Sequence, residues 1–454
     1  MSTALGDRWN VPTIGSVDVC VVGSGSAGSA AAIAAARGGA TVLLVEKSSF
    51  LGGTSTAALD TFYGFYTPGS RATKVVAGIG DDVIAGLRAL GPVVERPNTY
   101  GAGTGITYLA DHLKVVWERL VDDAGASILL HAFVQDADVH DGRVRAVLVA
   151  TKAGLRQVTA RVFIDASGDA DMCRFAGFAT ERAVESGPVQ ALTTTFRMAN
   201  VDQRLRARMP REAFHAAMAD AAASGEFDLP RREGSDHPTP IPGVTATVMT
   251  RLDGGLRTGS VAADATDPEF LTRAEIAGRR QAVEYARFLV DRVPGYGAAQ
   301  LVGSGTQIGV RETRRVQGDY RLTREDVLSA RSFDDQIGLC GAPIEDHHTG
   351  LGTSWQYLPD GAVVGIPYRT LIVRDATNVL VAGRCFSATH DAHASVRSMA
   401  QCMAMGQAAG TAAAMSAAAH ETPRTVSVTA LQARLRADGA ILSMDDAAVA
   451  ATGG

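Results

Sequence analysis

Residues 17–28 of the chain, VDVCVVGSGSAG, decide its fold. The first six form a short apolar run rich in β-branched side chains, which predicts a buried parallel strand. An alanine-rich stretch at 29–37 predicts a helix, and the run ATVLLV at 40–45 predicts a second buried strand. The order of strand, glycine-rich turn, helix and strand is typical of a Rossmann-type βαβ unit.

The turn between the first strand and the helix has the spacing G-x-G-x-x-G. Gly23 allows the tight turn, Gly25 lets a pyrophosphate approach the backbone, and Gly28 lets the helix pack closely on the strand. Free amides at the helix start would then hold the phosphates. Glu46 ends the second strand, where a carboxylate is expected to bind ribose hydroxyls. An ordinary βαβ turn is the alternative, but it leaves Glu46 unexplained, so the sequence predicts a dinucleotide site.

The later segments are similar to those of FAD-binding proteins. Residues 46–55, EKSSFLGGTS, resemble the E-K…GG-x-S stretch of the glutathione-reductase-like FAD superfamily, and residues 161–171, RVFIDASGDAD, resemble its A-T-G motif. Residues 378–410 resemble the GRCISATHEA…MALGQAAG segment of the bacterial family called FAD-dependent oxidoreductases. Shorter matches are GVRETRRV at 309–316, PIEDH at 343–347 and IPYRT at 366–370.

This resemblance implies FAD as the cofactor, and it implies which residues hold it. Succinate dehydrogenases carry a flavin-linking histidine near the position of Thr54, so FAD is expected to be non-covalent here. Arg384 replaces the acidic residue of the wider superfamily, and Ala400 replaces the proline that opens the family's last helix. The residues expected at the cofactor are Gly23, Ser24, Gly25, Ser26, Ala27 and Gly28 at the pyrophosphate, Glu46 at the AMP ribose, Lys47, Gly52, Gly53, Thr54 and Ser55 at the phosphates and flavin, Val134 (in a strand expected at 128–134), Ala166, Ser167 and Gly168 at the adenine end, Gly383 and Arg384 at the ribityl chain, and Ala400 and Gln401 at the flavin.

The fold class implied by the resemblance is α/β. It is a Rossmann-type FAD-binding domain of glutathione-reductase type, at 1–185 and 345–425, with an inserted α+β substrate (cap) domain at 186–344. Within the insertion, the patterns predict a strand at 193–198 and helices at 211–223 and 272–293. Residues 426–454 are expected to form a surface helix at 428–439 followed by a mobile tail.

Flavin chemistry needs few protein groups, chiefly ones that position the electron donor and move protons. His390 precedes the expected flavin helix and is a candidate acid–base or substrate hydrogen-bonding group, the alternative being a structural histidine in a turn. Arg397 is a candidate clamp for a substrate carboxylate. The alternatives for Arg397 are a flavin contact and an internal ion pair.

Three further residues match family positions and are candidates for the active site: Arg311, His347 and Tyr368. A strand is expected to place Arg311 and Arg315 on one face. Arg314 and Arg315 are expected to form an internal network with Glu312. No residues show metal-ligand spacing, and no metal is predicted.

Composition narrows the class of function. The chain has 454 residues, 46% of them hydrophobic and 20% charged, which is ordinary for an enzyme of two domains. A net charge of −5 argues against nucleic-acid binding. Five scattered cysteines without a C-x-x-C pair, and the lack of a strongly apolar span, favour a soluble cytoplasmic protein.

The predicted function is removal of hydride from a small polar organic substrate. The arginines near the expected site mildly favour an anionic one. A glycine-rich stretch at 303–309 lacks the spacing of a second nucleotide site, so oxygen, a quinone or a carrier is expected to re-oxidise the flavin. The alternatives are an ene-reductase of fumarate-reductase type fed by an external donor, a tRNA-modifying flavoprotein and a non-catalytic flavin-binding module. Substrate, electron acceptor and oligomeric state stay open.

Overall fold

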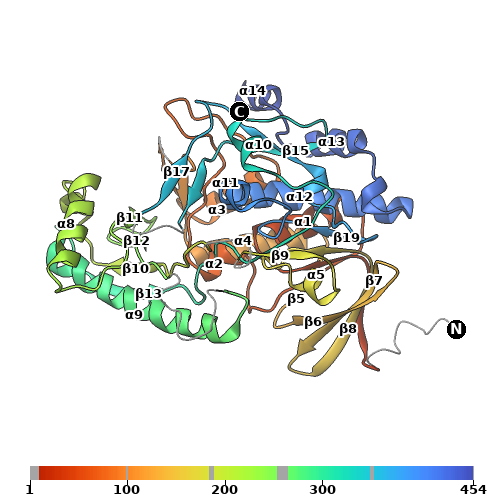
Figure 1. Ribbon diagram of the computed structural model, residues 1–454, viewed down its shortest axis with the longest axis horizontal. Helices are drawn as coiled ribbons and strands as arrows, with labels where there is room; N and C mark the ends of the chain where they lie inside the picture. Colours follow the sequence, from red (N-terminus) through yellow and green to blue (C-terminus); the bar gives the residue numbers. More distant parts are fainter. Residues whose placement is uncertain (1–9, 99–100, 184–188, 253–263, 348–351, 453–454) are drawn as a thin grey trace.

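The computed structural model describes residues 10–98, 101–183, 189–252, 264–347 and 352–452. A seven-stranded sheet lies at its centre (Figure 1). Four of its strands run parallel in the order β5 (Ser127–Leu129), β2 (Val42–Val45), β1 (Thr13–Val22) and β8 (Gly154–Asp165).

The long strand β8 has two partners on its other edge. Its first half pairs antiparallel with β7 (Arg143–Thr151), which pairs with β6 (Phe133–His140). Its last residues pair parallel with β19 (Val379–Val381). Strands from the two ends of the chain therefore meet in one sheet, and the carboxyl ends of the parallel strands share one edge.

Helix α1 (Ser26–Arg37) follows β1, and α12 (Met399–Ala419) packs directly against it. Small residues allow the close approach. A Cβ atom on Gly406 would lie 2.1 Å from the carbonyl oxygen of Ala27, and one on Gly410 would lie 2.2 Å from that of Ala31. Burial of these alanine-rich helices against Val19, Val21 and neighbouring apolar residues builds the main core.

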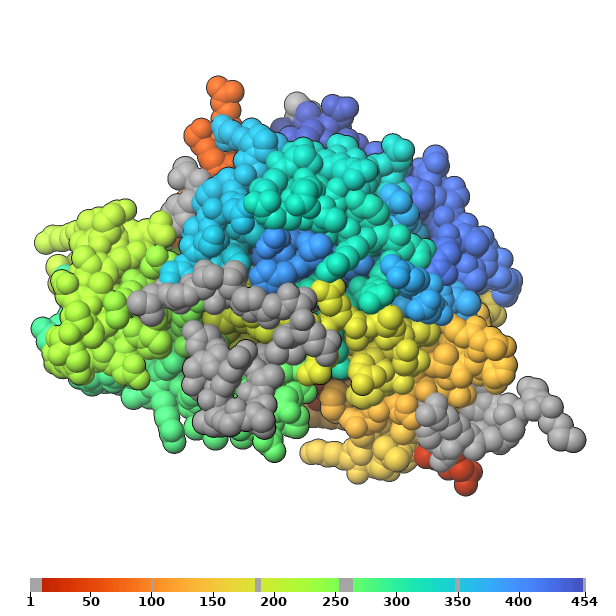
Figure 2. All heavy atoms as spheres, in the orientation of Figure 1, coloured from red at the N-terminus to blue at the C-terminus, as the bar shows by residue number. Residues whose placement is uncertain are grey.

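A second sheet lies to one side of the molecule, at the left of Figure 1. It is antiparallel, in the order β11 (Ser235–Pro238), β12 (Thr245–Val248), β10 (Phe196–Ala199) and β13 (Gln300–Ser304). Helices α8 (Arg211–Ala223) and α9 (Pro268–Arg292) pack on it around a separate apolar cluster. In the space-filling view these yellow-green and green residues form the left part of the surface (Figure 2).

Shorter elements complete the fold. They are α2 (Thr54–Ala57), α3 (Ile79–Leu90), β3 (Val94–Arg96), β4 (Gly105–Thr107), α4 (Ala110–Asp123), α5 (Asp171–Phe175), β9 (Thr180–Arg182), α7 (Gln203–Arg206), β14 (Arg314–Val316), α10 (Arg324–Leu328), β15 (Gln336–Cys340), β16 (Ile344–Asp346), β17 (Ser354–Gln356), β18 (Val364–Pro367), η2 (Tyr368–Thr370), α11 (His390–Val396), η3 (Pro423–Thr425), α13 (Val428–Ala437) and α14 (Met444–Thr452). Several of them, such as α3, α4 and α13, pack on the main core.

Most predicted elements are confirmed, with shifted ends, but two predictions are wrong. The single strand expected at 128–134 is two strands, β5 and β6, because His131 between them has a positive φ of 54° that breaks the extended backbone. The tail expected to be mobile forms α14, which is anchored by the buried side chains of Leu442 and Ala447.

The structure also tests the predicted positions of Arg311 and of the glycine-rich stretch at 303–309. Arg311 lies before β14 rather than in it, so it shares no strand face with Arg315. Residues 303–309 are not followed by a helix, in agreement with the rejection of a second nucleotide turn. Among the helices of the described segments, none has the length and hydrophobicity that a bilayer-crossing span requires.

Candidate functional site

A cavity of about 580 Å³ lies between the carboxyl edge of the central sheet and the second sheet. The glycine turn after β1 and the turn after β8 line one end, which we call the cofactor end. Residues that include Asp60, Arg231, Arg311, Glu345 and Arg397 line the rest, which we call the arginine end. The cavity thus joins segments from nearly the whole chain.

The three glycines of the turn meet three different surroundings. Gly23 has a φ of 93°, and a Cβ atom there would lie 2.6 Å from the carbonyl oxygen of Ala166. A Cβ atom on Gly28 would lie 1.8 Å from the carbonyl oxygen of Gly23. A Cβ atom on Gly25 would meet nothing within 4 Å, and Gly25 lines the cavity. Gly23 and Gly28 are therefore needed for packing, whereas the bare backbone of Gly25 leaves room for a ligand.

The second glycine pair packs against this turn. The Gly52 amide donates to the carbonyl oxygen of Ser24 (2.8 Å), and Gly53, with a φ of 52°, has room for no side chain because its Cβ would lie 2.9 Å from the Cα of Gly25. Gly53 and Thr54 line the cavity. Gly52 and Ser55 lie beneath them, with the Ser55 hydroxyl bonded to the Gly52 carbonyl oxygen (2.6 Å). The pair builds the cavity wall opposite α1.

Glu46 is held in place at the rim of the cofactor end. Its Oε2 accepts hydrogen bonds from the Ser24 amide (2.8 Å) and hydroxyl (2.6 Å), and its Oε1 accepts one from the Ser48 amide (2.7 Å). Lys47 lies beside it, with Nζ 5.7 Å from the centre of the Phe133 ring. The other expected residues of this end, Val134, Ala166, Ser167 and Gly168, also line the cavity.

Two helices begin at this cavity without a side-chain cap. The N-cap of α1 is Gly25, and that of α12 is Ser398, and neither residue caps its helix with a side-chain hydrogen bond. Uncapped amides at a helix start form a natural anion site. Together with Glu46 and the bare Gly25 backbone, this donor set fits a dinucleotide such as FAD.

The contribution of α12 comes from other residues than expected. Ser398, Met399 and Cys402 line the cavity, whereas Ala400 and Gln401 do not. The Ala400 amide donates to the Tyr63 carbonyl oxygen (3.3 Å), and Gln401 is buried with Nε2 bonded to the Gly64 carbonyl oxygen (2.8 Å). Successive residues of a helix point in different directions, so the motif located the helix correctly but did not show which of its residues face the cavity.

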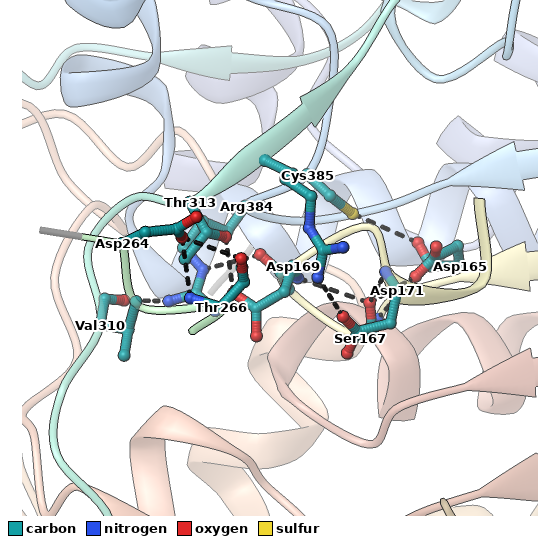
Figure 3. Close-up of polar contacts among 12 residues, drawn as sticks. Asp165, Ser167, Asp169, Asp171, Asp264, Thr266, Val310, Thr313, Arg384 and Cys385 are labelled. Atoms are coloured by element: carbon teal, nitrogen blue, oxygen red, sulfur yellow. Dashed lines mark hydrogen bonds and ion pairs between the residues drawn. The ribbon is translucent and has the colours of Figure 1, made fainter. Parts of the chain in front are cut away.

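Gly383 and Arg384 both line the cavity, but the Arg384 guanidinium is occupied by the protein itself. Its Nε donates to the Gly168 carbonyl oxygen (2.9 Å), its Nη2 bonds Asp169 (2.7 Å) and its Nη1 donates to the Val310 carbonyl oxygen. Figure 3 shows these groups together, with Thr313 also bonded to Asp169 (2.6 Å). Arg384 therefore ties the turn after β8 to the segment before β14.

Two arginines of the arginine end differ in their hydrogen bonds. Arg311 donates through Nη1 to the Ala191 carbonyl oxygen (2.6 Å) and the Thr193 hydroxyl (2.7 Å). The Arg397 guanidinium has no hydrogen bond or ion pair within the described part of the chain, and its Nε is buried without a partner. Burial lowers the pKa of both groups, that of Arg311 to about 9 with Arg397 contributing.

Glu345 and His347 form a bonded pair in the same wall. The His347 Nε2 lies 2.9 Å from Glu345 Oε1, and its Nδ1 lies 3.0 Å from the Thr353 hydroxyl. Burial lowers the pKa of His347, which keeps the imidazole neutral. Burial opposes ionisation of Glu345, but His347, Arg397 and Arg311 outweigh it and lower its pKa. Glu345 is therefore a permanent anion beside the two arginines.

Two candidate catalytic residues lie away from the cavity lining. Tyr368 is buried, and its hydroxyl donates to the Pro423 carbonyl oxygen (2.8 Å). His390 lies between Glu312, at 2.9 Å from Nδ1, and Asp346, at 3.5 Å from Nε2. Burial opposes the charge of His390, but these acids raise its pKa to about 9. The histidine is thus a charged partner of two buried acids, and its geometry does not support an acid–base role.

The expected internal network with Glu312 forms for Arg315 but not for Arg314. Arg315 bonds both Glu312 and Glu181, and Arg314 bonds Asp171 at 2.5 Å. Asp346, His390 and Asp391 come close enough to hold a metal ion, but each acid already has a basic neighbour, Asp391 through Arg324 at 3.8 Å. These groups neutralise one another.

Several cavity residues carry no motif and were missed. They are Asp60, Tyr63, Arg96, Arg231, His237 and Glu345. The family resemblance contained only one signal for them, because Glu345 lies within the PIEDH stretch that also contains His347.

Comparisons with known proteins agree with this geometry. Residues 18–435 match the family described as FAD dependent oxidoreductase. No curated protein matches the chain.

Three solved structures are similar to the chain at low sequence identity. A geranylgeranyl bacteriochlorophyll reductase-like protein from Thermoplasma acidophilum is 13% identical over 97% of this chain and 96% of its own, with a TM-score of 0.46. The flavin-dependent brominase Bmp2 is 16% identical over 93% and 84%, with a TM-score of 0.45. The myxobacterial chondrochloren halogenase CndH is 13% identical over 93% and 78%, with a TM-score of 0.46. Because the family match spans most of the sequence, the chain belongs to the FAD dependent oxidoreductase family and is an enzyme whose cofactor is FAD.

Proposed function

We propose that the enzyme dehydrogenates a small organic anion whose carboxylate is held by Arg397 and Arg311. One observation carries this proposal: Arg397 is a half-buried residue of the cavity wall whose Nε is buried without a partner in the described part of the chain. An unpaired buried charge is costly, and a ligand of opposite charge removes the cost. A planar guanidinium matches a carboxylate through two parallel hydrogen bonds.

The surroundings support an anionic substrate. The arginines of the arginine end outnumber its acids. The arginines are Arg96, Arg206, Arg211, Arg231, Arg311 and Arg397, and the acids are Asp60, Glu233, Asp236 and Glu345. Arg311 is oriented by Ala191 and Thr193, which fixes one side of its guanidinium and leaves the other for a ligand. Glu345 limits the excess positive charge and keeps both arginines charged.

Bound FAD supplies the chemistry by accepting two electrons and a hydrogen from the substrate carbon. The chain supplies the positions: the α1 and α12 starts would hold phosphate and flavin, and Glu46 the ribose. Thr54 at the wall offers no group for a covalent link, which favours non-covalent FAD. Oxygen, a quinone or a carrier would take the electrons afterwards.

The proposal assigns 1–185 and 345–425 to an FAD-binding domain of glutathione-reductase type, and 186–344 to a substrate cap. The composition of the arginine end supports this division. Arg231 and Arg311 come from the insertion, whereas Glu345 and Arg397 come from the second half of the FAD-binding part. A substrate would then lie between the two.

The test is anaerobic photometry of the purified flavoprotein with a panel of hydroxy and amino acids. Each acid is paired with its amide, which keeps the shape and removes the negative charge. Bleaching of the flavin by at least one acid, and not by its amide, is the expected result. Bleaching by amides and acids alike would contradict the anion clamp. Re-oxidation of pre-reduced flavin by unsaturated acids, without bleaching by any compound, would replace dehydrogenation with ene-reduction.

A further inference from the structure

We propose that Asp60 is the proton acceptor of the reaction, taking the O–H or N–H proton of the substrate. This inference rests on the proposed dehydrogenation and adds a residue to it. Asp60 follows α2, which begins at the cavity-lining Thr54, and Asp60 itself lines the same cavity as Arg311 and Arg397. It therefore lies in the arginine end, in a segment that starts at the cavity-lining Thr54.

The carboxyl group of Asp60 has one oxygen available. Oδ1 accepts a hydrogen bond from the Thr61 amide at 2.8 Å. Oδ2 has no hydrogen bond or ion pair with any group in the described ranges. The fixed Oδ1 sets the orientation of the carboxyl, and Oδ2 remains free to accept a proton.

The backbone around Asp60 is held from several sides. The carbonyl oxygen of Ala58 accepts a bond from the Thr195 hydroxyl, that of Leu59 from Arg197 at 2.7 Å, and that of Asp60 from the Tyr108 hydroxyl at 2.9 Å. Leu59 has a positive φ of 56°, which is uncommon for a branched side chain. Backbone strain of this kind persists only where the surrounding contacts impose it, and it concentrates at functional sites.

Two carboxyls of this cavity respond oppositely to their surroundings. Burial raises the pKa of Asp60, and it outweighs the arginines that favour the charged form. The pKa of Glu345 is lowered, as described above. When the pKa values of two neighbouring carboxyls are shifted in opposite directions, the one with the raised pKa can exchange protons and the other stays charged. The charged and titratable groups that face Asp60 are Arg197 on β10, Arg311 before β14, Arg397 after α11, Glu345 on β16, Tyr63, and Tyr108 after β4.

The proposed step balances in protons and electrons. The substrate C–H bond would break, and its hydrogen would leave with two electrons to the oxidant that FAD supplies when bound. The O–H or N–H bond breaks, and its proton goes to Asp60 Oδ2. The two electrons left on oxygen or nitrogen form the C=O or C=N bond, and Asp60 returns its proton to water after the product leaves.

The first test compares Asp60→Asn with wild-type enzyme in anaerobic flavin reduction by an acid from the panel. A missing general base lowers the rate by about 10²–10⁴-fold. We expect a loss in this range at saturating substrate, with normal FAD content. The wild-type rate should rise with pH as Asp60 loses its proton, and this rise should be absent in Asp60→Asn. The matched control, Asp123→Asn at an exposed site on α4, should leave the rate unchanged.

A second readout needs no substrate. Because burial raises the pKa of Asp60 above its ordinary value of 3.8, destabilisation by its ionisation begins as the pH rises past that value and is complete above the folded-state pKa. Asp60→Asn should therefore raise Tm more at pH 8 than near pH 4. An unchanged flavin reduction rate in Asp60→Asn would overturn the inference while the proposed function stands. Failure of every compound to reduce wild-type flavin would overturn the proposed function. A Tm difference that is equal at both pH values would overturn the buried carboxyl on which Asp60 depends.

Discussion

The two ends of the cavity differ in how the chain builds them. Most of the cofactor end comes from 23–54, where glycines and Glu46 follow one another at fixed spacing. The arginine end takes single residues from distant segments: Asp60, Arg231, Arg311 and Arg397. A local backbone shape is visible in sequence because it demands glycine, whereas charges that converge through folding leave no shared pattern.

The largest effect should come from the packing glycine of the cofactor end. The Cβ of Gly28→Ala would collide with the Gly23 carbonyl oxygen, so we expect about 3 kcal/mol of destabilisation and loss of FAD. Gly25→Ala has free space in the protein, so it should keep the stability of the apoprotein and weaken FAD binding alone. Thermal unfolding and FAD titration separate the two. Gly297→Ala, at an exposed open position, is the control and should change neither. If Gly25→Ala and Gly28→Ala had the same effects on stability and on FAD binding, the assignment of Gly28 to packing and of Gly25 to the ligand would be wrong.

At the arginine end, Arg397→Ala should slow flavin reduction by about 100-fold at low substrate concentration, equivalent to about 2.7 kcal/mol of lost binding. Higher substrate concentration should recover much of the rate. Stopped-flow photometry measures both regimes, with the exposed Arg71→Ala as control. Loss of FAD from Arg397→Ala would instead identify a cofactor contact, and the clamp would have to be abandoned.

His390→Gln tests a residue that lies outside both ends. The pKa of His390 is raised from 6.5 to about 9, so its stabilising contribution is complete below pH 6.5 and disappears as pH rises through about 9. It amounts to at most about 3 kcal/mol. Wild-type stability should therefore fall across this window, and that of the variant should stay flat, in urea unfolding. His140→Gln, at an exposed site, is the control. A large loss of flavin reduction in a stable His390→Gln enzyme would restore the catalytic role.

The smallest effect should come from Cys402, which lines the cavity from the first turn of α12. Burial raises the pKa of its thiol to about 12, so the thiolate needed for nucleophilic chemistry does not form at neutral pH. Cys402→Ala should change the rate of flavin reduction less than about 3-fold, within the range of a small packing change. The measurement is the same stopped-flow assay, and a 10-fold loss would show that the thiol takes part.

The sequence was sufficient for the βαβ unit, for Glu46 and for α12, because each depends on neighbouring residues. It could not show that His390 lies outside the cavity lining, because the acids that surround it, Glu312 and Asp346, come from other segments, and its catalytic role stays a prediction. It placed Tyr368 at the site because a family motif shows where the chain matches and not which way a side chain points. Asp60 was missed for the complementary reason, since a single aspartate after a short helix resembles any loop residue.

The contact between α1 and α12 has a consequence for how the enzyme is made. Gly406 and Gly410 lie against Ala27 and Ala31, so α1 meets its packing partner only after the residues between 37 and 399 have been synthesised. Until then, the nascent N-terminal βαβ unit exposes an alanine face that nothing covers. Because α12 also contributes Ser398 and Met399 to the cavity lining, the cofactor end is complete only once both helices have docked.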